Sequence, residues 1–181
     1  MAQANANELR KGKLVELDGR ICSVIFWNLW KSDRRSRVQM KFKDLLSGRI
    51  SEVTAQPDDR YVLLDSESID IEHSYRDGPD EVFYTHDGIE WRCPAAAAED
   101  ALVWQSQQYK GVVIEGKLIT VTAPHSVIAT ISETAPPIKG VSGGLKDAVL
   151  ENGIQVKVSV MCSVGDRVRI DSETLEFRER A

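Results

Sequence analysis

The sequence lacks the spaced ligand and phosphate motifs that mark many enzymes. Its three cysteines, Cys22, Cys93 and Cys162, lie far apart with no C-x-x-C pair, and we interpret them as buried thiols. The three histidines show no metal-ligand spacing, and no glycine-rich phosphate loop occurs. Paired carboxylates in the acidic middle of the chain could do acid–base work, but no nucleophile accompanies them. We therefore expect no metal, no cofactor and no catalytic residue.

Long apolar runs are also missing. No stretch of eighteen apolar residues is present, and the polar start "MAQANANELRKG" does not contain the apolar core of a signal peptide. The 181 residues are 42% hydrophobic with few aromatics, which is typical of a folded soluble chain. These features predict a cytoplasmic protein that does not use a membrane.

Positive charge is scarce overall but concentrated near the start. The net charge is −5, yet residues 1–50 hold 11 Lys/Arg against 5 Asp/Glu, whereas residues 51–181 hold 12 against 23. The stretch "WKSDRRSRV" lies at the centre of the basic part. This asymmetry predicts a basic front end that meets a polyanion.

Short strands and tight turns dominate the pattern. Apolar runs flank Asp18-Gly19, which predicts a two-residue hairpin, and apolar and polar residues alternate from Val38 to Lys43. Further turns are expected at Asp77-Gly78-Pro79, Asp87-Gly88 and Glu115-Gly116. The exception is "PAAAAEDALVWQSQQYK", which predicts a helix of about four turns.

This spacing predicts a mainly β fold of three small β-barrel domains. We place them at residues 1–65, 66–127 and 128–181, with the helix in the middle domain. The boundaries follow the change in charge and the segments "TAP" and "SETAPP".

Several segments resemble the bacterial elongation factor P family across the whole chain. The matching positions are Ala6 to Gly12, Lys41 to Gly48, Glu133 to Gly140, Lys146-Asp147-Ala148, Gly153, Val156, Val158 and Gly165. Three departures stand out. Ser159 and Cys162 replace a usual proline and an aliphatic residue, and the loop "VSGGL" is shorter than is usual in the family. The family's P-G-K-G tip is replaced here by Lys31-Ser32-Asp33-Arg34.

The resemblance implies an SH3-like (KOW-like) first domain and two OB-like domains arranged as an L. It implies a monomeric, non-enzymatic translation factor that binds the ribosome beside the peptidyl transfer RNA and relieves stalling at prolines. In some branches an arginine occupies the tip, and in one it is rhamnosylated. The tip residue here, a candidate for modification, is Arg34 or Arg35, because a one-residue slip in a hairpin changes the apex.

The predicted contact with transfer RNA and ribosome involves the basic stretch, because arginine's planar fork suits phosphates and bases. Its members are Lys31, Asp33, Arg34, Arg35, Arg37, Lys41 and Lys43. A secondary set on the third domain comprises Lys139, Lys146, Arg167 and Arg169.

Two alternatives remain open at this point. A charged tip is often simply solvated, and barrels of this kind also occur in general single-stranded RNA-binding or chaperone proteins. Trp30 could stack on a base, but we expect it to pack across the strand pair instead.

Overall fold

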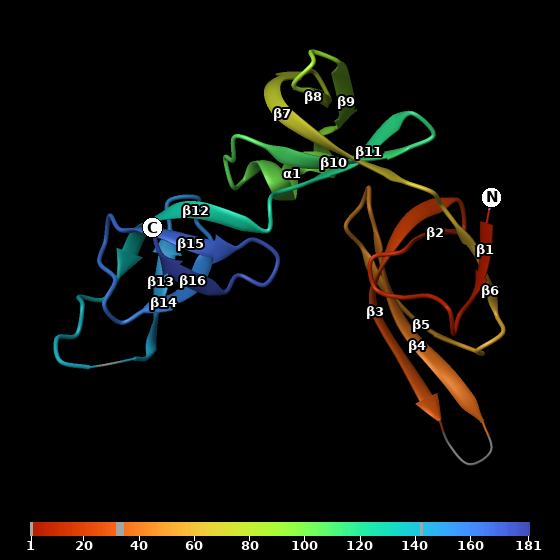
Figure 1. Cartoon of the computed structure of the whole chain (residues 1–181), viewed down its shortest axis with the longest axis horizontal. Coiled ribbons are helices and arrows are strands. Elements are labelled where there is room, and N and C mark those ends of the chain that lie inside the picture. Colours follow the sequence, from red (N-terminus) through yellow and green to blue (C-terminus); the bar gives the residue numbers. More distant parts are fainter. Residues whose placement is uncertain (1, 32–34, 142) are drawn as a thin grey trace. The chain divides into compact units, whose positions relative to one another are not determined.

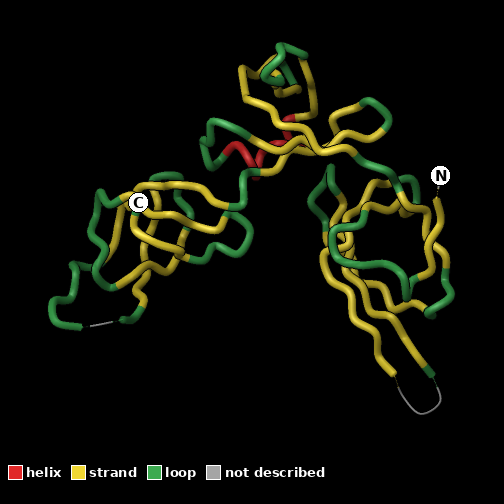
Figure 2. Tube along the Cα trace, in the orientation of Figure 1, coloured by secondary structure: helices red, strands yellow, loops and turns green. Residues whose placement is uncertain are grey.

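The computed structural model describes residues 2–31, 35–141 and 143–181, and this part of the chain forms sixteen strands and one short helix. The strands build three sheets in succession along the sequence (Figures 1 and 2). The predicted mainly β class is therefore confirmed, with three β-sheet domains, while closure of these sheets into barrels and the exact boundaries at residues 65 and 127 stay predictions.

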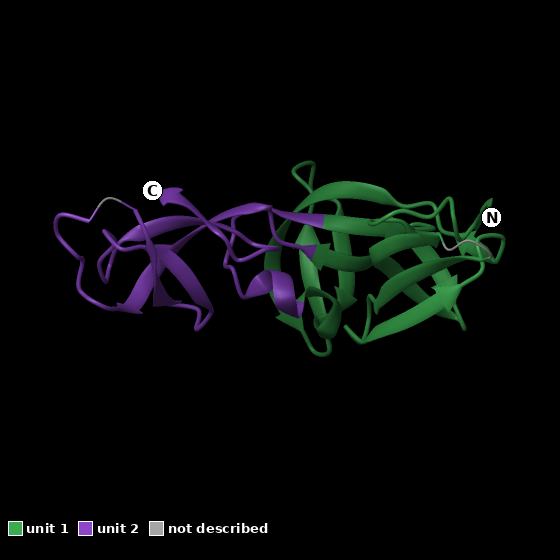
Figure 3. Cartoon of the chain, turned by 90° about the horizontal axis from the view of Figure 1, so that it is seen from below, with its two compact units in different colours: residues 1–98, 111–121 green, residues 99–110, 122–181 purple. Residues whose placement is uncertain are grey.

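The chain divides into two compact units, shown in different colours in Figure 3. The first unit comprises residues 1–98 and 111–121, and the second comprises residues 99–110 and 122–181. The segment from 99 to 110 therefore belongs with the third sheet, although it lies within the middle part of the sequence.

The first sheet has six strands in the order β1-β6-β2-β3-β4-β5. Their bounds are β1 Ala2–Asn5, β2 Leu14–Leu17, β3 Arg20–Lys31, β4 Ser36–Asp44, β5 Ile50–Ala55 and β6 Arg60–Leu63. Asp18 and Gly19 join β2 to β3 with φ angles of 51° and 75°. Both angles are positive, as a tight two-residue hairpin requires, so this turn was predicted correctly.

Alternation along β4 gives the first sheet its core. Val38, Met40 and Phe42 are fully buried, and they pack with Val15 and Val24 of the neighbouring strands. Polar residues between them point to the opposite face, because successive side chains of a strand alternate. The expected division of this strand into a core face and a charged face is confirmed.

The middle sheet has the order β11-β10-β7-β8-β9. Its strands are β7 Glu67–Asp77, β8 Asp80–Tyr84, β9 Glu90–Pro94, β10 Tyr109–Ile114 and β11 Lys117–Thr122. Gly78 and Pro79 close the β7–β8 hairpin, and Glu115 and Gly116 close β10–β11, with φ angles of 49° and 73° at the latter pair.

The helix is shorter than its alanine-rich sequence predicts. Helix α1 spans Ala95–Leu102, directly after Pro94, so its start is as expected and its length of eight residues is about half the predicted four turns. The chain leaves the helix at Trp104, whose side chain is buried among Val127, Ile131 and other core residues of the third sheet. This long-range packing overrides local helix propensity, and Gln105 then takes a φ of 48°.

The third sheet has the order β14-β13-β12-β15-β16. Its strands are β12 Ser126–Thr134, β13 Leu145–Leu150, β14 Gln155–Ser159, β15 Arg167–Asp171 and β16 Phe177–Arg180. An isolated parallel bridge between Lys157 and Glu176 brings the β14 edge near the start of β16.

The three cysteines are free and buried, as predicted. Burial raises the pKa of the Cys93 thiol to about 12, and the nearby Glu81 and Asp80 carboxylates add to this effect. A thiol with so high a pKa is a poor nucleophile at neutral pH.

Within the described ranges, no helix is long and apolar enough to cross a membrane.

Candidate nucleic-acid interface

The hairpin of β3 and β4 carries the basic stretch. Its strands pair from Cys22↔Asp44 to Lys31↔Ser36, whereas β5 accompanies β4 only as far as the pair Val38↔Ala55. The outer end of the hairpin therefore extends beyond its neighbour as a two-stranded arm, visible in orange in Figure 1. Of the predicted contact residues, Asp33 and Arg34 lie outside the described residues, and Arg35 directly precedes β4.

A β-bulge decides which side chains of β3 face outward. The pairing register shifts between Val24 and Phe26, so that Val24 and Trp27, three residues apart, both pair with buried residues of β4. From the bulge onward the even-numbered residues of β3 therefore lie on the outer face. On this face Trp30 pairs with Arg37, Asn28 pairs with Gln39, and Phe26 pairs with Lys41.

Trp27 and Trp30 consequently have opposite environments. The Nε1–H of Trp27 donates to the Ala6 carbonyl at 2.9 Å, and the Arg10 guanidinium lies 4.2 Å from its ring centroid. Trp30 is 62% exposed. The expectation that Trp30 packs across the strands is therefore wrong, because the bulge turns its ring to the outer face.

On the outer face, the polar side chains nearer the base of the arm have partners within the protein. The Lys41 ammonium lies 3.8 Å from a Glu52 carboxylate oxygen and 5.8 Å from the Phe26 ring centroid. Gln39 donates its side-chain amide to the same carboxylate. The positive charge of Lys41 is thus partly compensated, which reduces what it can offer to a polyanion.

The residues of this face at the far end of the arm have fewer contacts with neighbouring side chains. Arg35, Ser36, Arg37, Gln56 and Pro57 line a hollow between the start of β4 and the residues that follow β5. Within the described ranges, no hydrogen bond, ion pair or ring contact engages the side chains of Trp30 and Arg37. None of the five described lining residues is a carboxylate, so the surface that they form is suited to an anion.

Asp44 holds the base of the arm in place. Its buried carboxylate accepts hydrogen bonds from the backbone N–H groups of Leu46 and Ser47 at 2.9 and 3.1 Å. The Ser47 contact is the main reason why the pKa of Asp44 lies below its usual value, and Arg20 at 3.9 Å contributes. The turn that follows β4 is therefore fixed, and the arm starts from an ordered base.

The secondary set on the third sheet is divided. Lys146 donates from Nζ to the carbonyls of Ala135 and Cys162, and Arg169 donates to Glu179 at 2.8 Å. Lys139 and Arg167 are exposed. Two of the four cations thus make contacts inside their own domain, and the RNA-contact role of the set stays a prediction.

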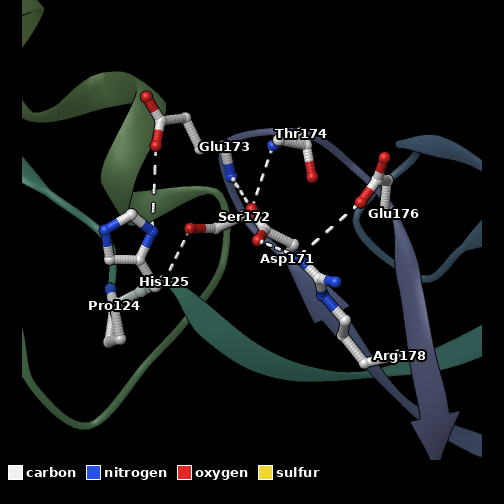
Figure 4. Close-up of polar contacts among 8 residues, drawn as sticks. All are labelled: Pro124, His125, Asp171, Ser172, Glu173, Thr174, Glu176 and Arg178. Carbon is white, nitrogen blue, oxygen red and sulfur yellow. Dashed lines mark hydrogen bonds and ion pairs between the residues drawn. The ribbon is translucent and has the colours of Figure 1, made fainter.

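A polar cluster between β15 and β16 was not foreseen from the sequence (Figure 4). Asp171 accepts from the backbone N–H groups of Glu173 and Thr174 and from Arg178 at 2.8 Å. Ser172 donates its hydroxyl to the Pro124 carbonyl at 2.6 Å and its amide to His125. The segment Asp171 to Thr174 reads "DSET", a turn signal that could have indicated this arrangement. The cluster fastens the turn to the start of β12.

Arg178 is the main reason why the pKa of Asp171 lies well below its usual value, and the backbone donors contribute. In the same part of the chain that the structure describes, no three His, Cys, Asp or Glu residues group in a way that could hold a metal ion. The contact between Asp171 and Arg178 therefore helps to hold the turn between β15 and β16.

Comparison with known proteins identifies the family to which this fold and hairpin belong. Residues 5–61 match the model of the elongation factor P (EF-P) KOW-like domain, and residues 127–180 match that of elongation factor P, C-terminal. Elongation factor P of Polynucleobacter necessarius subsp. necessarius (strain STIR1) is 34% identical over 97% of this chain and 98% of that protein. The chain belongs to the elongation factor P family.

Other relatives agree with this assignment. Elongation factor P of Cellvibrio japonicus (strain Ueda107) is 33% identical over 97% of each chain. Among solved structures, eukaryotic translation initiation factor 5A from Methanococcus jannaschii has a TM-score of 0.51 at 13% identity and covers 67% of this chain and 92% of that one. The latter likeness supports the fold alone. The resemblance read from the sequence is confirmed, and this elongation factor P family member has a role in translation elongation.

Proposed function

We propose that this factor binds the ribosome beside the peptidyl transfer RNA and stimulates peptide-bond formation at stalling sequences of the polyproline type. Its partners are then ribosomal RNA and proteins and the peptidyl transfer RNA. It acts in the cytoplasm as a monomer and without catalytic residues of its own. The observation that carries the proposal is the β3–β4 arm, which extends past β5 and carries arginine at its outer end in an elongation factor P fold.

Arginine is suited to the surface that such an arm would meet. Each phosphate that a cation neutralises releases counterions, and a guanidinium can bind phosphate with two parallel hydrogen bonds. The arm is held by paired strands and by the Asp44 turn at its base. An ordered arm can position the reacting end of a transfer RNA, and orientation of reactants alone contributes up to ~7–11 kcal/mol in model reactions.

The tip arginine takes the place of the modified lysine of the family. We propose that Arg34 or Arg35 occupies the apex and that it acts either modified or bare. Intact-mass spectrometry of protein purified from its own host, followed by peptide mapping of the tip, distinguishes the two cases. A mass increment of one deoxyhexose on the tip peptide identifies a rhamnosylated arginine, and an unchanged mass identifies an unmodified one.

The proposal is tested with the double variant Arg34→Ala/Arg35→Ala in reconstituted translation of a proline-rich message. We expect loss of rescue with a melting temperature close to that of the wild type, because both residues lie in the sequence between β3 and β4 and outside the two strands. The matched control is Arg49→Ala/Arg60→Ala, which removes the same charge from exposed positions of the same domain away from the arm. This control should retain rescue.

Full rescue by the tip variant would contradict the proposal. So would salt-sensitive binding to any free RNA, together with no effect on stalled ribosomes, which is the behaviour of a general single-stranded RNA-binding protein. The net charge of −5 argues against such general binding, because nonspecific affinity for nucleic acid depends on positive charge.

A further inference from the structure

We infer that Trp30 and Arg37 form a nucleotide subsite on the outer face of the arm, in which Trp30 stacks on an unpaired RNA base and Arg37 binds a phosphate beside it. The inference rests on the proposed function, because it names a contact of the same arm. It concerns a surface set back from the apex, formed by residues that lie within paired strands.

The first step is the exposure of the Trp30 ring. An indole that is 62% exposed leaves much of its apolar face in water, which is unfavourable unless a partner covers it. Phe26 on the same face is 40% exposed, and Lys41 lies over its ring. Among the described residues, no such cation covers the ring of Trp30.

The second step is the fixed position of Arg37. It pairs with Trp30 across the strands, so the two side chains emerge side by side from the same face. A stacked base on Trp30 therefore places its own backbone within reach of the guanidinium. Aromatic rings that alternate with cations are the usual means by which proteins hold single-stranded nucleic acid.

The third step is the chemistry of the hollow next to Arg37. Its lining residues include Arg35, Ser36, Arg37 and Gln56. All of these can donate hydrogen bonds, and none of them carries a negative charge. The geometry therefore suits a phosphate, and the ligand class that combines a flat ring with a phosphate is an unpaired nucleotide.

The main test compares Trp30→Leu with Trp30→Phe in the full chain acting on ribosomes stalled with peptidyl transfer RNA. We expect Trp30→Leu to raise the factor concentration for half-maximal rescue by about 5- to 150-fold, which corresponds to the loss of one stacked base. Trp30→Phe retains an aromatic face and should retain most of the affinity. Phe26→Leu is the matched control on the same face and should change little.

Stability is checked in parallel. Because Trp30 is exposed, Trp30→Leu should melt like the wild type; if it does not, Trp30→Gln replaces it in the same comparison. A half-maximal concentration for the folded variant equal to that of Phe26→Leu would overturn the inference while leaving the proposed function intact.

A second measurement does not depend on the ribosome. Binding of a short single-stranded RNA is compared with binding of the same strand carrying abasic sites, for the wild type and for Trp30→Leu. We expect the wild type to prefer the strand with bases and the variant to lose this preference. If the wild type does not rescue stalled ribosomes, the proposed function is wrong, and the RNA-binding measurement alone tests the nucleotide subsite. In that case, equal binding of the two strands by the wild type would overturn the inference.

Discussion

The β3–β4 hairpin of the first sheet and the β15–β16 hairpin of the third are both rich in arginine, but their cations have different surroundings. On β15–β16, Arg178 contacts Asp171 at 2.8 Å, Arg169 contacts Glu179 at 2.8 Å, and Arg180 contacts Asp166 at 3.0 Å. On β3–β4, Arg37 has no such partner in the described ranges and borders a hollow that no described carboxylate lines.

The difference shows that the number of arginines in a hairpin does not define its role. Carboxylates of the same hairpin, and Asp166 just before it, pair with Arg169, Arg178 and Arg180, so these cations stabilise the hairpin itself. The outer end of β3–β4 extends past β5, so β5 supplies no carboxylates to the cations there. A projecting arm therefore leaves its charge for a partner.

The largest expected effect tests whether the arm depends on the core beneath it. Phe42 is fully buried on the inner face of β4, and Phe42→Ala should destabilise the first sheet by about 3–5 kcal/mol. Arg37→Ala on the outer face should cost less than about 0.5 kcal/mol. Amide hydrogen exchange of β3 and β4 in increasing urea measures both. Equal losses would show that the two faces of β4 are not divided as described.

A smaller effect separates the two hairpins by function. Arg37→Ala should weaken binding to single-stranded RNA about tenfold, as expected for one charge-assisted hydrogen-bonding group. It should also make the slope of log K against log salt shallower by about 0.7, because one phosphate contact is lost. Arg178→Ala should leave affinity and slope unchanged and should increase amide exchange only in the β15–β16 turn. Titration at several salt concentrations checks both variants, and a reduced slope for Arg178→Ala would remove the contrast.

The smallest effect concerns the acid stability of β15–β16. Because the pKa of Asp171 is lowered in the folded protein, its contribution to stability is present above the unfolded value of about 3.9 and is lost as pH falls through the folded pKa. Amide exchange in the β15–β16 turn, corrected for intrinsic rates, should therefore accelerate below about pH 4. Asp171→Asn should make this turn less stable at neutral pH and abolish the acceleration. Asp58→Asn, at an exposed loop position, is the control and should behave like the wild type.

Much of the fold could be predicted because its signals are local. Asp18-Gly19 tolerates the positive φ angles that a two-residue hairpin needs, and the alternation from Val38 to Phe42 defines a buried face. The length of helix α1 could not be predicted, since it ends where Trp104 enters a core built from residues after Val127. Helix propensity contains no information about that distant core.

The features of the candidate site also fall into those that the sequence predicts and those that depend on the tertiary structure. By itself the sequence determined the basic hairpin, its strands, the arginines near its tip and the family to which the chain belongs, because these depend on residue type and order. Only the tertiary structure decided which face each side chain joins. The bulge between Val24 and Phe26 shifts the register by one residue, and a shift of one residue moves every later side chain to the other face. It places Trp27 against Ala6 and leaves Trp30 beside Arg37 in solvent.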